Sequence, residues 1–298
     1  MKLTRAKAVL LMVFAAFLWS TAGVVTRHLE SARSFEVTFW RSFFTVLSLL
    51  AMLPMLRGRV VVFQLFNQLS SSSSGRALWL SGLCWSVMFS AYMVALTLTT
   101  VANVLVTLAL GPLFTALMAR VFTGHRIAVP TWWAIGLAGI GIAWMFGGQA
   151  DLSAHWAGTL VALMVPIAAA CNWTLVQHNQ VHGRNVDLVP AVLVGALISS
   201  FTMLPLALPF AATTHDIALL ALLGVVQLAI PCVLSVWCAS VLRAPEMALL
   251  AMLEVIFGTL LAWAGAGETP SSSVLYGGTL VIVALIGNEW LGWSRARP

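Results

Sequence analysis

Two charged residues lie well inside long apolar stretches of this 298-residue chain, away from the ends of those stretches. Glu254 lies near the middle of its stretch, and Arg41 lies nearer the start of an earlier one. If the stretches are in lipid, each charge costs roughly 2.5–3.5 kcal/mol unless it faces a cavity or a partner. Glu254 could contact an ammonium group or carry a proton, or it could be a neutral, hydrogen-bonded packing residue. Arg41 could hold a carboxylate, or it could pair with Glu30, Glu36 or helix-end carbonyls.

Uncharged polar and aromatic side chains recur in the same stretches. Polar groups of this kind either bond to neighbouring helices or line a water-filled space. Four aromatic residues lie deeper than an interfacial belt explains, and their rings could stack on an apolar group, receive a cation or simply fill space. The candidate ligand-contacting residues are therefore Trp19, Ser90, Tyr92, Asn103, Thr107, Asn172, Trp173, Gln227, Trp237 and Glu254.

Sequence motifs for catalysis and for nucleotide or metal binding are missing. The chain has no glycine-rich phosphate loop with a lysine, no His-Glu-x-x-His and no Gly-x-Ser-x-Gly. His178 and His182 lie one turn apart, but two histidines alone make a weak metal site. The four cysteines lie within apolar stretches, where packing suits them better than a disulfide framework. We therefore expect no enzyme, no cofactor and no metal.

These residues belong to ten apolar stretches, each about long enough to cross a bilayer as a helix. A hydrocarbon core of ~30 Å needs ~20 apolar residues of helix. The chain is 61% hydrophobic and 8% charged, with a mean hydropathy of +0.98, whereas a soluble domain carries roughly 25% charge. Helices are expected because lipid offers no partner for free backbone groups. The expected spans are Ala6–Val25, Phe35–Leu56, Ala77–Thr97, Val101–Phe122, Trp132–Phe146, Trp156–Gln177, Leu188–Phe210, Ile217–Val241, Met247–Ala264 and Val274–Trp290.

Three prolines, Pro112, Pro166 and Pro231, fall inside these spans. Each removes a hydrogen bond from its helix and bends it locally. The bends could act as gates around a cavity, or they could be ordinary kinks.

The positive charges predict how the chain is oriented. Lys and Arg favour the cytoplasmic side of short loops. With the N-terminus inside, twelve loop Lys and Arg residues lie inside, and only Arg27 and Arg33 lie outside. We therefore expect both termini to be cytoplasmic. The net charge of +6 then needs no nucleic acid or acidic substrate to explain it.

The second half of the chain repeats features of the first. Leu110 to Phe114 align with Leu253 to Phe257, and Ala15 to Ser20 align with Ala169 to Thr174. Each half holds five spans, so the two halves would cross the membrane in opposite senses. We expect one membrane domain of two inverted five-helix repeats, residues 1–147 and 148–298. Secondary transporters often have this design, with a substrate site at mid-depth between the repeats.

Several motifs resemble the EamA-type proteins of the drug/metabolite transporter superfamily. The run from Ala91 to Ile127 resembles the family pattern, and Ala239 to Ile286 resembles its second copy. Trp19-Ser20 and Phe39-Trp40-Arg41 resemble the usual starts of the first two spans. The chain departs from the pattern at His125, where an acidic residue is common, and at Val255, where proline is common. Within the superfamily the chain is similar to bacterial aromatic amino-acid exporters.

The resemblance implies a secondary transporter of the bacterial inner membrane. Its first, third, fourth, sixth, eighth and ninth spans would surround a central cavity. It would export amino acids, with aromatic or other apolar side chains preferred, by alternating access, as a uniporter or by proton-linked exchange. The partners would be a small-molecule substrate and the lipid bilayer. Export of drug-like or other small metabolites is the alternative, and a non-transport membrane subunit is a further one.

Overall fold

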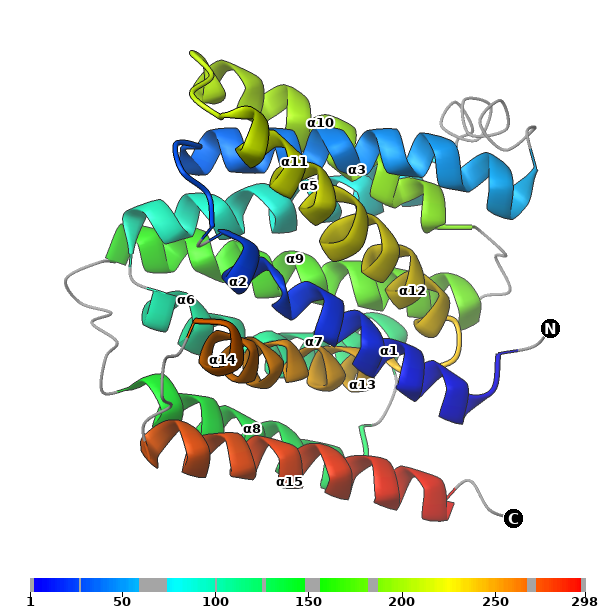
Figure 1. The fold of residues 1–298 in the computed structure, drawn as a ribbon. Coiled ribbons are helices and arrows are strands. Elements are labelled where there is room, and N and C mark those ends of the chain that lie inside the picture. The colour runs from blue at the N-terminus through cyan, green and yellow to red at the C-terminus, as the bar shows by residue number, and fades with distance from the viewer. Residues whose placement is uncertain are drawn as a thin grey trace.

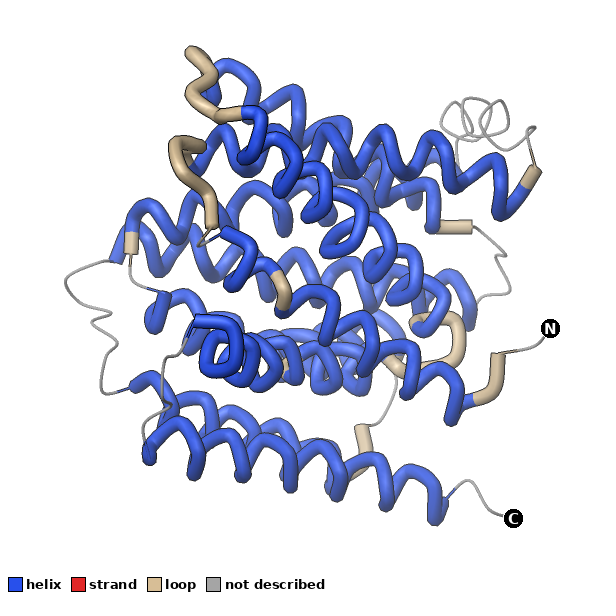
Figure 2. The backbone as a smooth tube through the Cα atoms, viewed as in Figure 1, coloured by secondary structure: helices blue, strands red, loops and turns tan. Residues whose placement is uncertain are grey.

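The protein is all-helical. The computed structural model describes residues 3–26, 28–58, 74–99, 101–124, 127–147, 156–181, 187–266 and 272–295, and within these ranges no residue lies in a strand. The helices lie roughly side by side, and successive passes run in alternating directions (Figure 1). The described loops between them lie mainly at the two ends of the bundle (Figure 2). The structure confirms the expected all-α polytopic architecture.

Each expected span falls on one helix or on consecutive helices. Among the described residues, seven segments are long and apolar enough to cross a membrane, and Val129–Met145 and Ser272–Asn288 are shorter apolar helices. The helices are α1 (Arg5–Ser20), α2 (Ala22–Thr26), α3 (Ser34–Arg57), α5 (Ser74–Leu98), α6 (Val101–Leu108), α7 (Gly111–Thr123), α8 (Val129–Phe146), α9 (Trp156–Val181), α10 (Val189–Ala207), α11 (Thr214–Leu222), the π-helix η2 (Leu223–Ala229), α12 (Ile230–Cys238), α13 (Ala244–Ala251), α14 (Leu253–Ala266) and α15 (Ser272–Arg295).

Four passes are interrupted along their length. The first breaks at Thr21, whose hydroxyl bonds to the Leu18 carbonyl at 2.7 Å. Another breaks before Pro112 at the start of α7, and a third breaks at Met252 between α13 and α14. The fourth contains η2, which ends just before Pro231. Because proline has no N–H to donate, a change of helix type beside it is expected. Interrupted helices free backbone groups inside a bundle, where ligands can use them.

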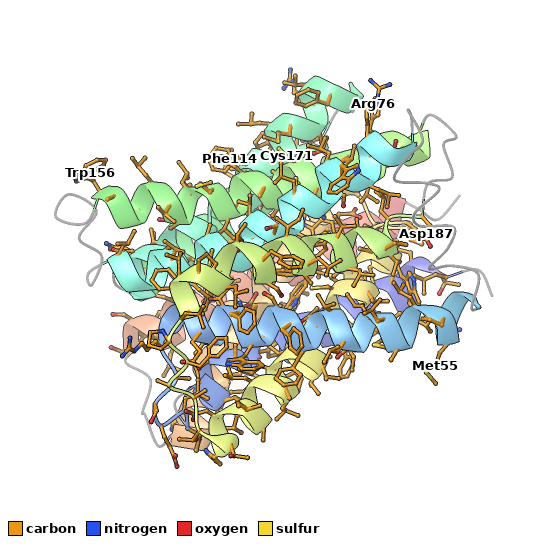
Figure 3. All side chains as sticks on the ribbon, turned by 90° about the horizontal axis from the view of Figure 1, so that it is seen from above. Met55, Arg76, Phe114, Trp156, Cys171 and Asp187 are labelled. Carbon is orange, nitrogen blue, oxygen red and sulfur yellow. The ribbon has the colours of Figure 1, made fainter. Side chains whose placement is uncertain are left out.

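Small residues let α8 and α15 approach each other closely. α8 and α15 form a pair at one edge of the molecule (Figure 1), where a Cβ on Gly277 would lie 2.4 Å from the Gly141 carbonyl oxygen. α5 packs between α9 and α10. α9 also packs against α7, where the Cys171 Sγ lies 3.6 Å from the Met118 Sδ; Cys171 is labelled in Figure 3. All four cysteines are free thiols.

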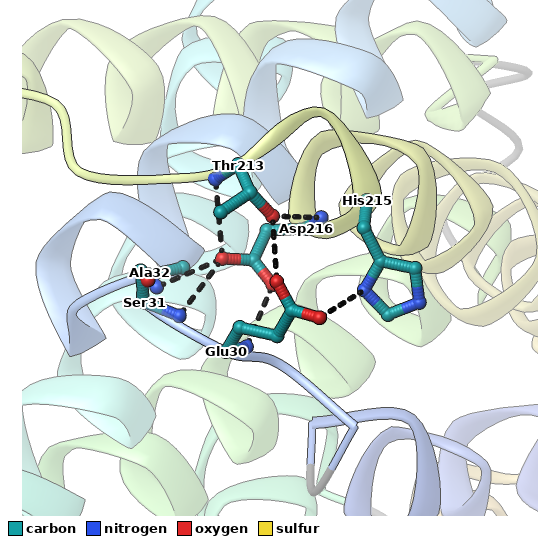
Figure 4. Close-up of polar contacts among 6 residues, drawn as sticks. All are labelled: Glu30, Ser31, Ala32, Thr213, His215 and Asp216. Atoms are coloured by element: carbon teal, nitrogen blue, oxygen red, sulfur yellow. Dashed lines mark hydrogen bonds and ion pairs between the residues drawn. The ribbon is translucent and has the colours of Figure 1, made fainter.

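Two carboxylates join the loops at the end of the bundle opposite the start of α1. Asp216, in the first turn of α11, accepts bonds from the backbone N–H groups of Glu30, Ser31, Ala32 and Thr213 at 2.8–3.3 Å (Figure 4). Glu36, in the first turn of α3, accepts N–H bonds from Ala211 and Ala212, both at 2.9 Å. Asp216 of α11 therefore binds the loop before α3, and Glu36 of α3 binds the loop before α11.

Candidate functional site

Arg41 and Glu254, the two ionisable residues deep inside the apolar spans, lie near each other inside the bundle. Arg41 of α3 is only 3% exposed, and its charge interacts with Glu254 of α14. Within the described part of the chain, the two side chains form no ion pair within 4.0 Å. Arg41 Nε is buried without a hydrogen-bond partner there. A cation and an anion are thus held near each other but apart.

Glu254 owes its position to the break at Met252. It lies in the first turn of α14, where the backbone N–H groups of a helix lack intrahelical partners and carry a partial positive charge. A carboxylate at this position is favoured electrostatically. The Glu254 side chain is partly exposed, although it lies among the side chains of the cluster. It is therefore placed to receive a ligand.

Gln227 reaches this region from the π-helix. Its Nε2 donates to the Trp19 carbonyl at 3.3 Å, near the end of α1. Its Oε1 is buried and, among the described residues, has no hydrogen-bond partner. Gly224 brings this turn against α3, because a Cβ there would lie 2.8 Å from the Arg41 carbonyl oxygen. This close approach keeps the π-helix that carries Gln227 against the part of α3 that carries Arg41.

Tyr92 and Cys232 complete this group, which we call the charged cluster: Trp19, Arg41, Tyr92, Gln227, Cys232 and Glu254. The Tyr92 and Cys232 side chains lie within reach of the charges of Arg41 and Glu254, and Cys232 lies beside the Trp19 side chain. The structure thus brings together four of the sequence-predicted residues. It adds Cys232, which the sequence gave no reason to select, and Arg41 with its helix α3, which the expected set of cavity-lining spans did not include.

Five other sequence-predicted residues bond or pack elsewhere. The Ser90 hydroxyl lies 3.0 Å from that of Ser199, between α5 and α10. The Thr107 hydroxyl bonds to the Asn103 carbonyl one turn earlier, and Asn103 Nδ2 bonds to Thr99. Asn172 accepts a 2.6 Å bond from Ser81 across α5 and α9. Trp237 packs on the main hydrophobic core. These contacts join helices or turns of one helix.

Trp173 lines a second region, an apolar cavity of about 100 Å³ where α7, α9 and α13 meet. Its indole packs edge-on against that of Trp85, with ring centroids 5.7 Å apart. Pro112 and Met252, at two of the helix interruptions, and Pro166, inside the continuous helix α9, also line this cavity. We call this space the proline cavity. It has no charged lining residue.

Polar contacts tie helices together at the end of the bundle where α1 begins. Arg5 Nη1 contacts both carboxylate oxygens of Glu246 at 3.1 Å, which joins α1 to α13. Gln177 of α9 accepts a bond from the Ala244 N–H at 3.1 Å. These contacts connect the first, sixth and ninth passes. His182, proposed with His178 as a weak metal pair, lies outside the described residues.

A further acidic group lies at the opposite end. Ligand atoms of Glu30, His215 and Asp216 lie within 4.8 Å of one another. Asp216 already accepts four backbone N–H bonds, and Glu30 lies 3.9 Å from His215 (Figure 4). The arrangement is that of a loop cap.

Comparison with known proteins agrees with this architecture. Residues 6–147 match the EamA-like transporter family, which is most of the expected first repeat. None of the curated proteins matches the chain. A solved crystal structure, titled only as that of a protein, superposes with a TM-score of 0.75 at 17% identity, covering 97% of this chain and 99% of the other. The structural match shows a shared fold, and the family match supports a membrane transporter of the drug/metabolite transporter superfamily.

Proposed function

We propose that the protein exports amino acids with aromatic or other apolar side chains across the bacterial inner membrane. One observation carries this proposal: Glu254 is a carboxylate without an ion-pair partner among the described residues, set inside the bundle in the same charged cluster as Tyr92 and Trp19. A substrate ammonium group would bind the carboxylate by a charge-assisted hydrogen bond. Aromatic faces would favour an apolar ring and the cation beside it.

The same features also suit a second candidate function. A drug-like amine or another small cationic metabolite has an ammonium group and an apolar body, and the EamA-like match supports transport of either kind of molecule. A non-transport membrane subunit is less well supported, because an uncompensated ionisable group in a span usually serves a ligand or ion pathway. Transport instead of catalysis is also what the family match supports.

The proline cavity supports the proposed inverted repeat. Residues lining it align in pairs by the same offset that aligns Leu110 with Leu253: Leu105 with Ala248, Leu108 with Ala251, Ala109 with Met252 and Pro112 with Val255. A cavity lined by equivalent residues from two repeats would lie on their pseudo-two-fold axis. Alternating access would then arise as one repeat rocks against the other.

The orientation remains part of the proposal. α1 begins and α15 ends at the same end of the bundle (Figure 1), as an even number of spans requires. We place this end in the cytoplasm because the basic loops favour that side. Gln149 and Pro298, suitable sites for topology reporters, lie outside the described residues. A reporter should be periplasmic at Gln149 and cytoplasmic at Pro298. Transport would occur by uniport or by proton-linked exchange.

Counterflow in proteoliposomes tests the proposed function. Liposomes loaded with unlabelled phenylalanine should take up labelled phenylalanine through the wild-type protein. Glu254→Gln keeps the shape of the side chain and removes its charge, so counterflow should fall about 10- to 100-fold, the value of one or two charged hydrogen bonds. Glu30→Gln alters a carboxylate that is 60% exposed at the loop end, and it serves as the control. Unchanged counterflow in Glu254→Gln would contradict the proposal.

A further inference from the structure

Among the described residues, Arg41 has no acidic ion-pair partner that would explain its burial. The two acids nearest to it in sequence, Glu30 and Glu36, are engaged at the loop end. Glu36 accepts bonds from Ala211, Ala212 and the Trp40 indole. Glu30 contacts Thr213 and His215. The structural pairing that the sequence allowed for Arg41 is therefore not formed with either acid.

The environment of Arg41 would favour an anion. The side chain is 97% buried, since only 3% of its surface is exposed, and Nε has no acceptor among the described residues. A buried guanidinium without a bonded counter-charge is strongly unfavourable. Its planar fork of N–H donors matches the two oxygens of a carboxylate. Glu254 supplies a compensating field, but the two residues do not pair.

We propose that Arg41 binds the carboxylate of the substrate, so that the charged cluster selects molecules carrying both an ammonium and a carboxylate group. This inference rests on the proposed function and narrows it, because it favours amino acids over drug-like amines. The substrate ammonium binds Glu254 on α14, and its carboxylate binds Arg41 on α3. A zwitterion compensates both charges. An amine alone leaves Arg41 without a partner, and a carboxylic acid alone leaves Glu254 without one.

Thr45 and Gly224 attach the π-helix to α3 at Arg41. The Arg41 carbonyl accepts a 2.8 Å bond from Thr45, whose hydroxyl also bonds to the Gly224 carbonyl at 3.0 Å. The π-helix is thereby attached to α3 at the residue that carries the guanidinium. Gln227, three residues after Gly224, bonds to Trp19. The anion-binding and aromatic parts of the cluster are thus held by one short segment.

Three ligands that share a phenyl ring separate the contributions of the two charges. They are phenylalanine, phenethylamine (no carboxylate) and 3-phenylpropanoate (no ammonium), and their binding to the purified full-length protein can be measured calorimetrically. Phenylalanine should bind the wild type at least about tenfold more tightly than either analogue, as expected for a buried charge-assisted pair. In Arg41→Gln, phenylalanine should bind no more tightly than phenethylamine does. In Glu254→Gln, it should bind no more tightly than 3-phenylpropanoate does.

Two further variants keep the test decisive. Arg41→Lys retains the charge but not the planar fork, so it should give an intermediate preference for phenylalanine and shows the effect even if Arg41→Gln does not fold. Arg120→Gln changes an exposed arginine of α7 and should leave all three affinities unchanged.

If the phenylalanine preference persists in both Arg41 variants, Arg41 does not bind the carboxylate. If the wild type binds phenethylamine as tightly as phenylalanine, the zwitterion proposal is wrong, whereas transport of amines would stand. Failure of all three ligands to bind would contradict the amino-acid function as well.

Discussion

The charged cluster and the proline cavity both include residues of the α13–α14 pass, and each contains one of two aligned tryptophans. On the α1 side, the Trp19 carbonyl is held by Gln227, and the ring is half-buried near Arg41 and Glu254. On the α9 side, Trp173 is 4% exposed and packs against Trp85 beside an uncharged cavity. In the proposed repeat these are equivalent positions with different surroundings.

The surroundings of aligned positions in the two proposed repeats differ most at Arg41. By the offset that aligns Trp19 with Trp173, Arg41 aligns with Gly195. Gly195 lies so close to α5 that a Cβ would be 2.4 Å from the Trp85 Cβ. One face therefore has a buried cation where the other has a close helix contact. A duplicated framework can in this way keep one polar binding face and use the other for packing and for helix movement.

The largest expected effect separates the two tryptophans. Trp173→Ala removes a buried side chain, so it should lower the free energy of unfolding by about 3–5 kcal/mol while phenylalanine affinity stays near that of the wild type. Trp19→Ala should have the smaller effect on stability and should weaken phenylalanine binding roughly threefold to tenfold, the value of one aromatic contact. Thermal unfolding in detergent and calorimetric binding measure the two effects. If Trp173→Ala weakens phenylalanine binding and Trp19→Ala does not, the substrate binds in the proline cavity instead.

Breaking the Arg5–Glu246 contact should have a smaller effect, on how fast a reagent reaches the charged cluster. The pair is part-exposed, with 27% and 12% of the side chains accessible, so its loss should cost no more than about 1 kcal/mol. In Arg5→Gln, a water-soluble thiol reagent should therefore label Gln227→Cys up to about fivefold faster from the end of the bundle where α1 begins. The background lacks the four native cysteines.

Two variants calibrate this labelling experiment. Arg5→Lys keeps the charge but cannot make both contacts, so its rate should be intermediate. Arg120→Gln should label like the parent. Equal labelling rates in all of these variants would show that the Arg5–Glu246 contact does not restrict access from that end.

The smallest expected effect concerns Asn172, a sequence-predicted site residue that bonds to Ser81. Hydrogen bonds between membrane helices are worth about 0.6 kcal/mol on average, so Asn172→Ala should lower stability by about that amount. A double-mutant cycle with Ser81→Ala in thermal unfolding should recover the same coupling. Phenylalanine affinity should not change. A clear loss of affinity in Asn172→Ala would add this residue to the binding site and weaken the contrast between the two faces.

The positions of the helices could be predicted from the sequence better than their rotations. Length and hydropathy locate the passes, and Pro112 and Pro231 mark two of the interruptions. Spans that are apolar all round, however, have no distinct polar face to show which side points inward. Thr107 and Asn172 could therefore have lined a cavity as readily as they bond within α6 or across to α5.

Arg41 shows a second limit of sequence reasoning. Its possible partners, Glu30 and Glu36, lie nearby in the chain, but α11 and the loop before it provide the groups that contact these acids. Such long-range contacts follow from the packing of distant helices. Glu254 was easier to select because a carboxylate in the middle of an apolar span is conspicuous whatever the packing.

The position of a bound substrate tests the central claim most directly. A crystal structure of the full-length protein with 4-bromophenylalanine would locate the bromine by its anomalous scattering and the amino-acid group by its density. The account predicts that the ammonium and carboxylate groups lie between Glu254 and Arg41, with the carboxylate hydrogen-bonded to the guanidinium. An amino-acid group bound in the proline cavity beside Trp173, or one that contacts neither Arg41 nor Glu254, would contradict it.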